Sequence, residues 1–286
     1  MTHEQQESLR CRLTAAGGAE DTRLPAGAWF VVRADDSVVT GYTSGKVLIQ
    51  GRGAASIVSL IDDVLNSGRP NPGNMPFPVV GGDESGKGDV FGPLVVAAFA
   101  VRSQAERQEV VAVGARDCKL MNDGEVQAVA PKLSRLGMSS VRVLMPAEYN
   151  SRYARVRNVN ILLNEIYADL LSGLAARSGA RTVILDKYGG RASSLWKAQQ
   201  DFRFVVETQA ERYPEVAAAS VLARAAFLDG LDRTARDSGI ERLPKGASLE
   251  TQAFMSRLVA ERGSDILRSI AKVNFAPVRA CLDSLF

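Results

Sequence analysis

The chain has 286 residues and a formal net charge of +3, and 46% of its residues are hydrophobic and 23% charged. These values are ordinary for a globular protein with one large domain or two unequal ones. The small net charge makes an overall basic footprint weak, so any nucleic acid would bind through local clusters. No apolar run approaches the roughly 18 residues that cross a bilayer, and the polar N-terminus lacks the apolar core of a signal peptide. We therefore expect a cytoplasmic protein that does not bind membranes.

The first 66 residues predict a small α+β domain. A helix is expected over residues 4–16, followed by strands over 28–33, 37–42 and 46–50 and a helix over 54–65. A stretch rich in Pro, Gly and Asn, residues 67–77, predicts a linker to a larger domain, residues 78–286.

The larger domain predicts a mixed sheet with helices on its faces. Two apolar runs, residues 79–84 and 94–101, flank a Gly/Pro-rich connection and predict a β-hairpin. Further strands are expected over residues 141–145, 182–185 and 202–206, and helices over 124–136, 159–176, 214–236, 248–262 and 277–285. Pro131 should kink or shorten the first of these helices, and Asn158 is well placed to cap the second.

The hairpin connection carries the residues with the clearest chemistry. Asp83 and Glu84 end the first apolar run, and a glycine-rich loop with Lys87 follows at once. Carboxylates can hold hard cations, and exposed amides with a lysine can hold phosphate, so the combination suggests phosphoryl chemistry. A P-loop is the sharpest alternative, but Gly88 stands where that motif needs Ser or Thr. A surface hairpin with two solvated acids is the plainer alternative.

Acids also accompany two later strands. Asp186 ends one apolar segment, and Glu211 follows another. Acids at strand ends of an α/β sheet tend to converge on one crevice, although a turn acid and a first-turn helix charge are the plainer interpretations. Neighbouring strand residues point to opposite faces, so Asp83 and Glu84 can share a metal site only if the strand distorts or ends at Glu84.

The rest of the composition limits the chemistry further. His3 is the only histidine and the three cysteines are widely spaced, which argues against a histidine base, a zinc site and a disulfide framework. Hydrolysis would then depend on carboxylates, Lys, Tyr or metal-bound water. Oxygen donors without His or Cys favour Mg²⁺ or Mn²⁺, and two such ions could position a water and stabilise a leaving oxygen.

The segment GGDESGKGDVFGPLVVAA, residues 81–98, closely resembles the signature of the type 2 ribonucleases H, specifically ribonuclease HIII. Further segments are similar to family motifs in the same order: DCKLM (117–121), NVN (158–160), VILD (183–186), Ala210-Glu211 with VAAASVLAR (216–224), and LPKGAS (243–248). Residues 42–51, YTSGKVLIQG, resemble the hallmark of the family's N-terminal TBP-like substrate-binding domain.

The resemblance implies a ribonuclease H-like fold for residues 78–286 and cleavage of the RNA strand of RNA/DNA hybrids. It names Asp83, Glu84, Asp186 and Glu211 as the catalytic, metal-binding acids for Mg²⁺ or Mn²⁺. The products would carry 5′-phosphate and 3′-hydroxyl ends, and we expect a monomer. Substrate contacts are expected from Ser85, Gly86, Lys87, Gly88, Lys119, Asn158, Tyr42 and Lys46.

Some positions depart from the family pattern and leave details open. Cys118 replaces the usual Ser, Lys187 stands where Gln is common, and Gln209 stands where Lys is frequent. Asn158 could serve as a helix cap and Lys119 as a solvated lysine. The Tyr- and Arg-rich residues 149–157 could track a nucleic-acid backbone or form a solvated face. Two functional alternatives are activity on single embedded ribonucleotides, as in ribonuclease HII, and nucleic-acid binding without turnover.

Overall fold

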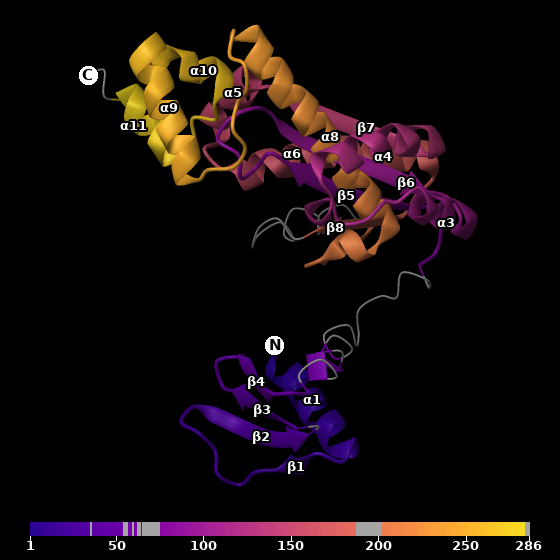
Figure 1. Ribbon diagram of the computed structural model, residues 1–286. Helices are drawn as coiled ribbons and strands as arrows, with labels where there is room; N and C mark the ends of the chain where they lie inside the picture. The colour runs from indigo at the N-terminus through magenta and orange to yellow at the C-terminus, as the bar shows by residue number, and fades with distance from the viewer. Residues whose placement is uncertain are drawn as a thin grey trace. The chain divides into compact units, whose positions relative to one another are not determined.

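The computed structural model describes residues 1–34, 36–53, 57–58, 60–61, 64, 75–186 and 202–283. The chain divides into two compact units, Met1–Asn74 and Met75–Phe286 (Figure 1). Most of the expected linker and Lys187 lie outside the described residues. Within the described residues, no helix combines the length and apolar character needed to cross a bilayer.

The N-terminal unit packs helical residues on an antiparallel sheet. α1 (His3–Ala15) begins at a capping box formed by Thr2 and Gln5. The four-stranded sheet has the order β1 (Ala19–Glu20), β2 (Ala28–Ala34), β3 (Ser37–Tyr42), β4 (Val47–Gly51). Its core includes Leu9, Leu13, Phe30, Val32 and Val39. The α+β class is confirmed; residues 57, 58, 60, 61 and 64 of the expected second helix are helical, and the rest of that helix lies outside the described residues.

The larger unit is built on a five-stranded mixed sheet with the order β7-β6-β5-β8-β9. The strands are β5 (Val79–Ser85), β6 (Leu94–Val101), β7 (Met138–Leu144), β8 (Thr182–Asp186) and β9 (Arg203–Glu207). β5 pairs antiparallel with β6, as the hairpin prediction requires, and parallel with β8. The strand that carries the paired acids is therefore the central strand of the sheet.

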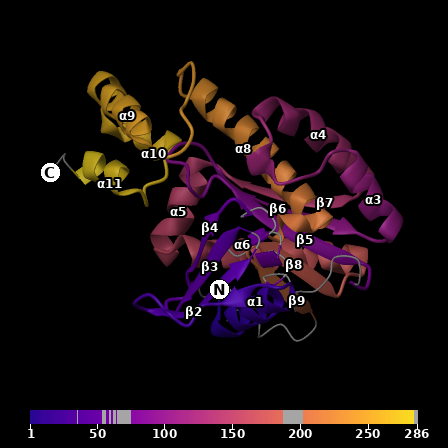
Figure 2. The same ribbon diagram turned by 60° about the horizontal axis from the view of Figure 1, so that its bottom comes forward.

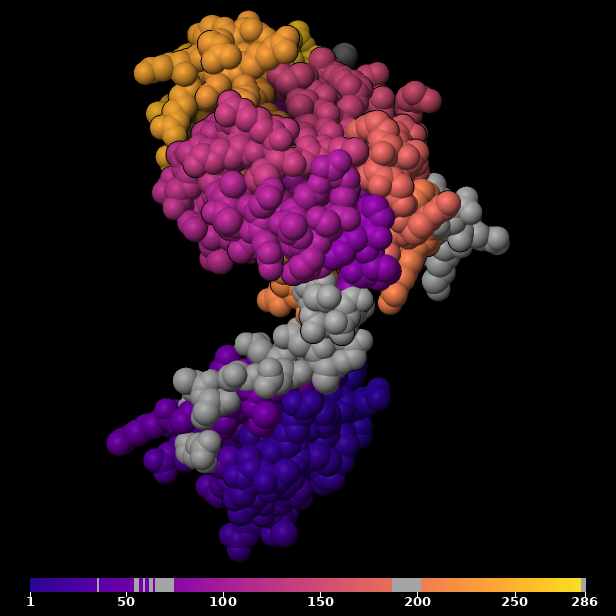
Figure 3. All heavy atoms as spheres, turned by 90° about the vertical axis from the view of Figure 1, so that its right-hand side faces the viewer, coloured from indigo at the N-terminus to yellow at the C-terminus, as the bar shows by residue number. Residues whose placement is uncertain are grey.

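The helical segments are α3 (Gln104–Ala112), η2 (Cys118–Leu120), α4 (Asp123–Leu136), α5 (Pro146–Val156), α6 (Val159–Ser178), η3 (Ala210–Arg212), α8 (Pro214–Asp237), α9 (Leu249–Arg262), η4 (Ser264–Ile266), α10 (Leu267–Ile270) and α11 (Ala276–Asp283). α8 and α4 lie on one side of the sheet and α6 on the other (Figure 2). Figure 3 views the protein from the right-hand side of Figure 1, and the magenta region that contains α3 and α4 lies at the front of the larger unit there.

The sheet is buried on both faces. Val95, Ala97 and Phe99 of β6 belong to the core with α4 and α8. The alternating residues Val96 and Ala98 belong to the core with α6. This two-sided burial explains why β6 is a continuous apolar run instead of an alternating one. It also assigns each β5 residue to a face through its β6 partner.

Several sequence expectations need correction. Pro131 does not shorten α4, which runs to Leu136; the proline is exposed, so water can satisfy the carbonyl group that loses its helical donor. β7 begins at Met138, three residues before the expected start. α3 and α5 were not predicted, and α5 makes the Tyr- and Arg-rich run an amphipathic helix whose Tyr149 is buried.

Candidate active site

Asp83 and Glu84 lie on opposite faces of the central strand. The β5–β6 register is regular through Ser85↔Val95, so β5 neither distorts nor ends at Glu84, which is the condition stated above for one shared metal site. Asp83 pairs with Ala97 and faces α8, whereas Glu84 pairs with Val96 and faces α6. The pairing of β5 with β8 stops at Gly82↔Leu185. Asp83 and Glu84 therefore have no strand partner on the β8 side.

Asp83 is a buried carboxyl group, only 8% exposed. Burial, followed by the charge of Glu84, raises the pKa of Asp83 to about 8, while a hydrogen bond with Ser220 of α8 opposes the shift. Ser220 Oγ lies 3.0 Å from the Sγ atom of Cys118. Cys118, which stands where the family usually has Ser, therefore contacts Ser220, a partner of Asp83.

Glu84 is held from two directions. The Tyr167 hydroxyl of α6 donates to Oε2 of Glu84 at 2.7 Å, and Lys87 Nζ lies 3.7 Å from Oε1. Burial raises the pKa of Glu84, and both of these neighbours act against that shift. The charge of Asp186 adds to the increase, so the two acids interact electrostatically across the end of the sheet.

Asp186 and Glu211 lie on the side of β5 where β8 pairs, opposite β6. Asp186 ends β8, and its Oδ1 accepts a hydrogen bond from the backbone N–H of Ala210 at 3.2 Å. Glu211 follows in η3 and is buried, with Oε1 2.6 Å from Nζ of Lys119 in η2. The Glu211 hydrogen bond holds the pKa of Lys119 above its ordinary value. Gln209 starts this turn in the left-handed region, at φ 61°.

The four acids form an electrostatically coupled group around the ends of β5 and β8. Their side chains are not gathered into one ligand cluster, because no group of three or more His, Cys, Asp or Glu among the described residues is arranged to hold a metal ion. Lys119 pairs with Glu211, and Lys87 approaches Glu84. Nevertheless, the donor chemistry fits a hard divalent cation, since burial and the charge of Glu84 together raise the pKa of Asp83 and a bound cation would favour the ionised carboxylate.

The glycine-rich loop leaves its backbone open to a ligand. Gly86 has φ 87°, and a Cβ atom there would lie 2.2 Å from the carbonyl oxygen of Pro93. A Cβ atom on Gly88 would meet nothing within 4 Å. Ser85 and Lys87, at the end of β5 and in the loop, are half-buried. A side chain at Gly86 would thus clash with Pro93, whereas the backbone at Gly88 is open to a ligand.

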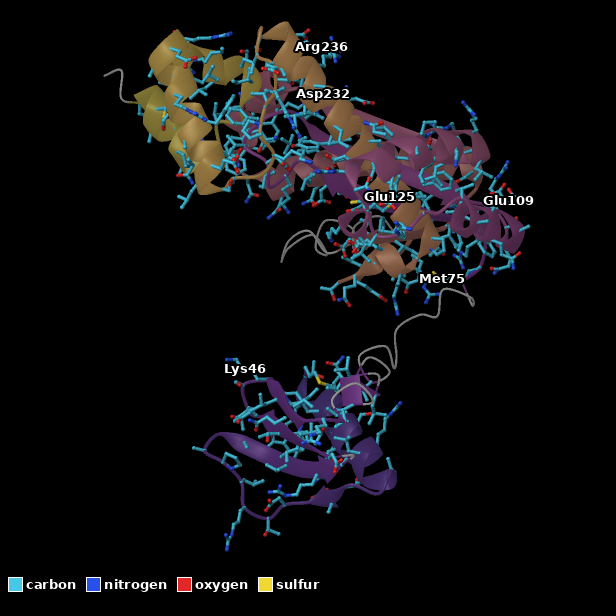
Figure 4. All side chains as sticks on the ribbon, in the orientation of Figure 1. Lys46, Met75, Glu109, Glu125, Asp232 and Arg236 are labelled. Carbon is cyan, nitrogen blue, oxygen red and sulfur yellow. The ribbon has the colours of Figure 1, made fainter. Side chains whose placement is uncertain are left out.

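The remaining expected substrate residues are placed differently. Asn158 caps α6, accepting from the backbone N–H of Asn160 at 2.9 Å, which matches the helix-cap interpretation. In the N-terminal unit, Tyr42 ends β3 and Lys46 projects from the turn before β4 (Figure 4). Sequence reasoning missed Tyr167 and Ser220 as partners of the acids. A tyrosine on an apolar helix face is a usable signal, because its buried hydroxyl needs a partner.

Comparison with known proteins gives the family. The family model described as Ribonuclease HII matches residues 80–278, and a domain of unknown function, DUF3378, matches residues 1–65. Ribonuclease HIII of Protochlamydia amoebophila is 33% identical over 267 residues, covering 91% of this chain and 88% of that protein. Ribonuclease HIII of Geobacillus kaustophilus is 32% identical and covers 91% and 90% of the two chains.

The chain belongs to the ribonuclease HIII family. The expected resemblance and the ribonuclease H-like fold are therefore confirmed, and the protein is an endoribonuclease H that acts on RNA/DNA hybrids. Bst-RNase HIII in complex with Mn²⁺ matches with a TM-score of 0.65 and 29% identity, covering 98% of this chain and 96% of that one. The Aquifex aeolicus RNase H3 structure matches with a TM-score of 0.59 and 26% identity, covering 96% and 98%. The Bst-RNase HIII structure thus holds a divalent metal ion of the kind that the oxygen-only donor set described above fits.

Proposed function

We propose that Asp83, Glu84, Asp186 and Glu211 are the metal ligands with which this enzyme hydrolyses the RNA strand of a hybrid. The observation that carries this assignment is the placement of these buried or half-buried acids at the ends of β5 and β8 and in the adjoining η3. These residues would hold divalent ions, and such ions, when bound, would supply an activated water and stabilise the leaving oxygen, consistent with 5′-phosphate and 3′-hydroxyl ends.

The chain's own residues prepare these ligands. Tyr167 fixes Oε2 of Glu84, so its carboxylate keeps one orientation at the sheet end. The Ala210 N–H does the same for Asp186. Lys119 forms an ion pair with Glu211, so a cation that binds this carboxylate would have to displace the lysine or share the carboxylate with it.

We propose that residues 85–88 contact the ribose and phosphate of the RNA strand. Support comes from the open approach to Gly88 and from the neighbouring Lys87, which is a point charge suited to phosphate. The 2′-hydroxyl that distinguishes RNA from DNA would meet backbone groups of this loop.

The N-terminal unit is proposed to grip the hybrid through the surface around Tyr42 and Lys46. Lys46 is exposed on the turn that follows β3, where it can reach a nucleic-acid backbone. Deleting residues 1–74 should raise KM for the hybrid with a smaller effect on kcat. An unchanged KM at physiological salt would refute this role.

The preferred substrate is proposed to be a run of consecutive ribonucleotides. Lys87 lacks the planar fork of an arginine, so it positions one isolated ribonucleotide poorly, whereas a run offers several registers. Equal cleavage rates on a duplex with one ribonucleotide and on a continuous hybrid would favour the ribonuclease HII-like alternative. We further propose that the enzyme acts as a cytoplasmic monomer, in keeping with its three free cysteines.

The central experiment is cleavage of an end-labelled RNA/DNA hybrid with Mg²⁺, with Mn²⁺ and with excess EDTA. Cleavage should require a divalent ion, because the proposed ligands are oxygen atoms only. The comparison of the two ions at saturating concentration identifies the preferred one. Full activity in EDTA would contradict the metal-dependent mechanism.

A further inference from the structure

Lys272 is a buried lysine that lies beneath the glycine-rich loop. Its side chain is fully buried, and Nζ donates to the backbone oxygens of Asp89 at 2.9 Å and Phe91 at 3.3 Å. Nζ also lies 6.0 Å from the ring centre of Tyr149. A buried lysine is costly unless its donors are satisfied, so these two carbonyl contacts explain why it is tolerated.

The backbone beside these carbonyls is fixed by a second segment. The N–H of Gly246 donates to Oδ1 of Asp89 at 2.6 Å, and the N–H of Val90 donates to the oxygen of Gly246 at 3.0 Å. The segment around Lys272 adds main-chain bonds: Lys272 N–H to Val90 oxygen at 2.9 Å, and Gly92 N–H to Ile270 oxygen at 3.0 Å. Residues 89–92 are thus held between two distant parts of the chain.

The segment that carries Lys272 is itself held by α5. Asn150 Nδ2 donates to the oxygen of Ala271 at 2.9 Å, and Asn150 Oδ1 accepts from Val273 N–H at 3.0 Å. The Tyr149 hydroxyl donates to Asn274 Oδ1 at 2.9 Å. Lys272 is therefore anchored on a rigid support and not on a free tail.

Asp89 connects this support to the open part of the loop. Its N–H donates to the oxygen of Gly86 at 3.3 Å, which closes the turn over Lys87 and Gly88. A fixed Asp89 therefore fixes the turn. A loop that is ordered before binding avoids an ordering cost when the substrate arrives.

We propose that Asp89 and Lys272 are positioning residues that hold the Gly86–Gly88 turn in the conformation that recognises the RNA strand. This inference rests on the proposed contact between that turn and the ribonucleotides. It assigns to two residues outside the four acids a share in binding and in the discrimination between RNA and DNA.

Three variants and two controls test this proposal. Asp89→Ala removes the acceptor for the Gly246 N–H, whereas Asp89→Asn keeps an oxygen at that position. Lys272→Met keeps the apolar stem and removes the donors. Asp237→Ala and Lys132→Met, both at exposed positions of α8 and α4, are the controls.

The first readout is hybrid binding in EDTA, measured by fluorescence anisotropy with a hybrid and a DNA duplex of the same sequence. We expect Asp89→Ala and Lys272→Met to weaken hybrid binding at least tenfold and to reduce the hybrid-to-duplex affinity ratio. Asp89→Asn and the controls should stay within about threefold of wild type. A merely structural role would weaken the two duplexes equally, and that result overturns the proposal.

The second readout separates KM from kcat in folded variants, as judged by circular dichroism and Tm. We expect KM for the hybrid to rise while kcat and the half-saturating metal concentration change by less than threefold. Folded Asp89→Ala and Lys272→Met proteins with wild-type KM and affinity ratio would overturn the positioning role. If wild type binds the hybrid but does not cleave it, the proposed function fails, and the binding ratio still tests the positioning role.

Discussion

Nζ of Lys119 lies 2.6 Å from Oε1 of Glu211, although 92 residues separate the two along the chain. The lysine therefore competes with any cation for a buried carboxylate. Its own side chain is 69% exposed, so its hold on Glu211 is weakened by solvent. This arrangement differs from the expected pairing of Lys119 with a substrate phosphate and leads to a test that distinguishes the two.

Replacing Lys119 with Met should lower the half-saturating Mg²⁺ concentration several-fold, because one competitor for Glu211 is removed. The measurement is a metal titration of cleavage at saturating hybrid, with Lys132→Met as an exposed-lysine control. If Lys119 chiefly binds phosphate, the variant will instead show a raised KM and an unchanged metal requirement.

Asp186→Asn should reduce kcat by orders of magnitude while the fold stays intact. The substitution removes a ligand charge but keeps an oxygen that can accept from the Ala210 N–H. Steady-state kinetics and the thermal unfolding midpoint test both halves of this expectation. Turnover near the wild-type value would show that Asp186 is not a catalytic metal ligand.

Gly88→Ala should leave stability unchanged and raise KM for the hybrid at least tenfold. The added methyl group would meet no protein atom within 4 Å, so any effect arises from the substrate that approaches this backbone. Gly173→Ala on the exposed side of α6 is the control and should leave KM unchanged. Wild-type KM for Gly88→Ala would show that the RNA strand does not approach the loop here.

Arg107→Leu should destabilise the larger unit by about 3–5 kcal/mol, because it leaves the fully buried Glu215 without its partner. In the native protein Arg107 Nη2 lies 2.8 Å from Glu215 Oε1, and both side chains are buried. Denaturant unfolding measures the loss, and the double variant with Glu215→Leu should recover part of it. A single variant as stable as wild type would contradict this account of the pair.

The stability of the protein should depend on Lys272 in alkaline solution. Burial lowers the pKa of Lys272 to about 7, from an ordinary value of 10.5 in the unfolded chain. Between these two values the unfolded state binds the extra proton, so this residue makes the free energy of unfolding rise as pH increases. The contribution is lost as pH falls through about 7.

The check is denaturant unfolding of wild type and Lys272→Met at several pH values from 7 to 10. The difference between the two proteins isolates this residue from other titrating groups. The free energy of unfolding of wild type minus that of Lys272→Met should increase as pH increases. Parallel curves would show that Lys272 keeps its ordinary pKa in the folded protein.

Sequence reasoning located the hairpin, the mixed sheet and the acids because these depend on local patterns. Apolar runs and their turn residues predict strands directly, and Asp83, Glu84 and Asp186 stand at the ends of such runs. The regular register through Ser85 was not predictable, since it depends on which β6 residues pair with β5.

Contacts between distant segments account for most of what the sequence did not predict. Tyr167 is one apolar-face residue among many until α6 packs on the sheet and brings its hydroxyl to Glu84. Lys272 looks like an ordinary surface lysine in the sequence, because its burial depends on the packing of α5 and the glycine-rich loop. α5 itself begins at Pro146 without a side-chain cap, so the proline in its first turn is the start signal that it offers.

The contact between Lys272 and Asp89 joins residues 183 positions apart, and it therefore bears on how the enzyme is made. During synthesis the β5–β6 hairpin leaves the ribosome before the anchor of its connecting loop, because Lys272 follows Asp89 by 183 positions. Pairings between such distant residues also form late in folding, because the intervening chain must first be ordered. The nascent chain consequently carries its acidic strand long before it can hold the loop beside it.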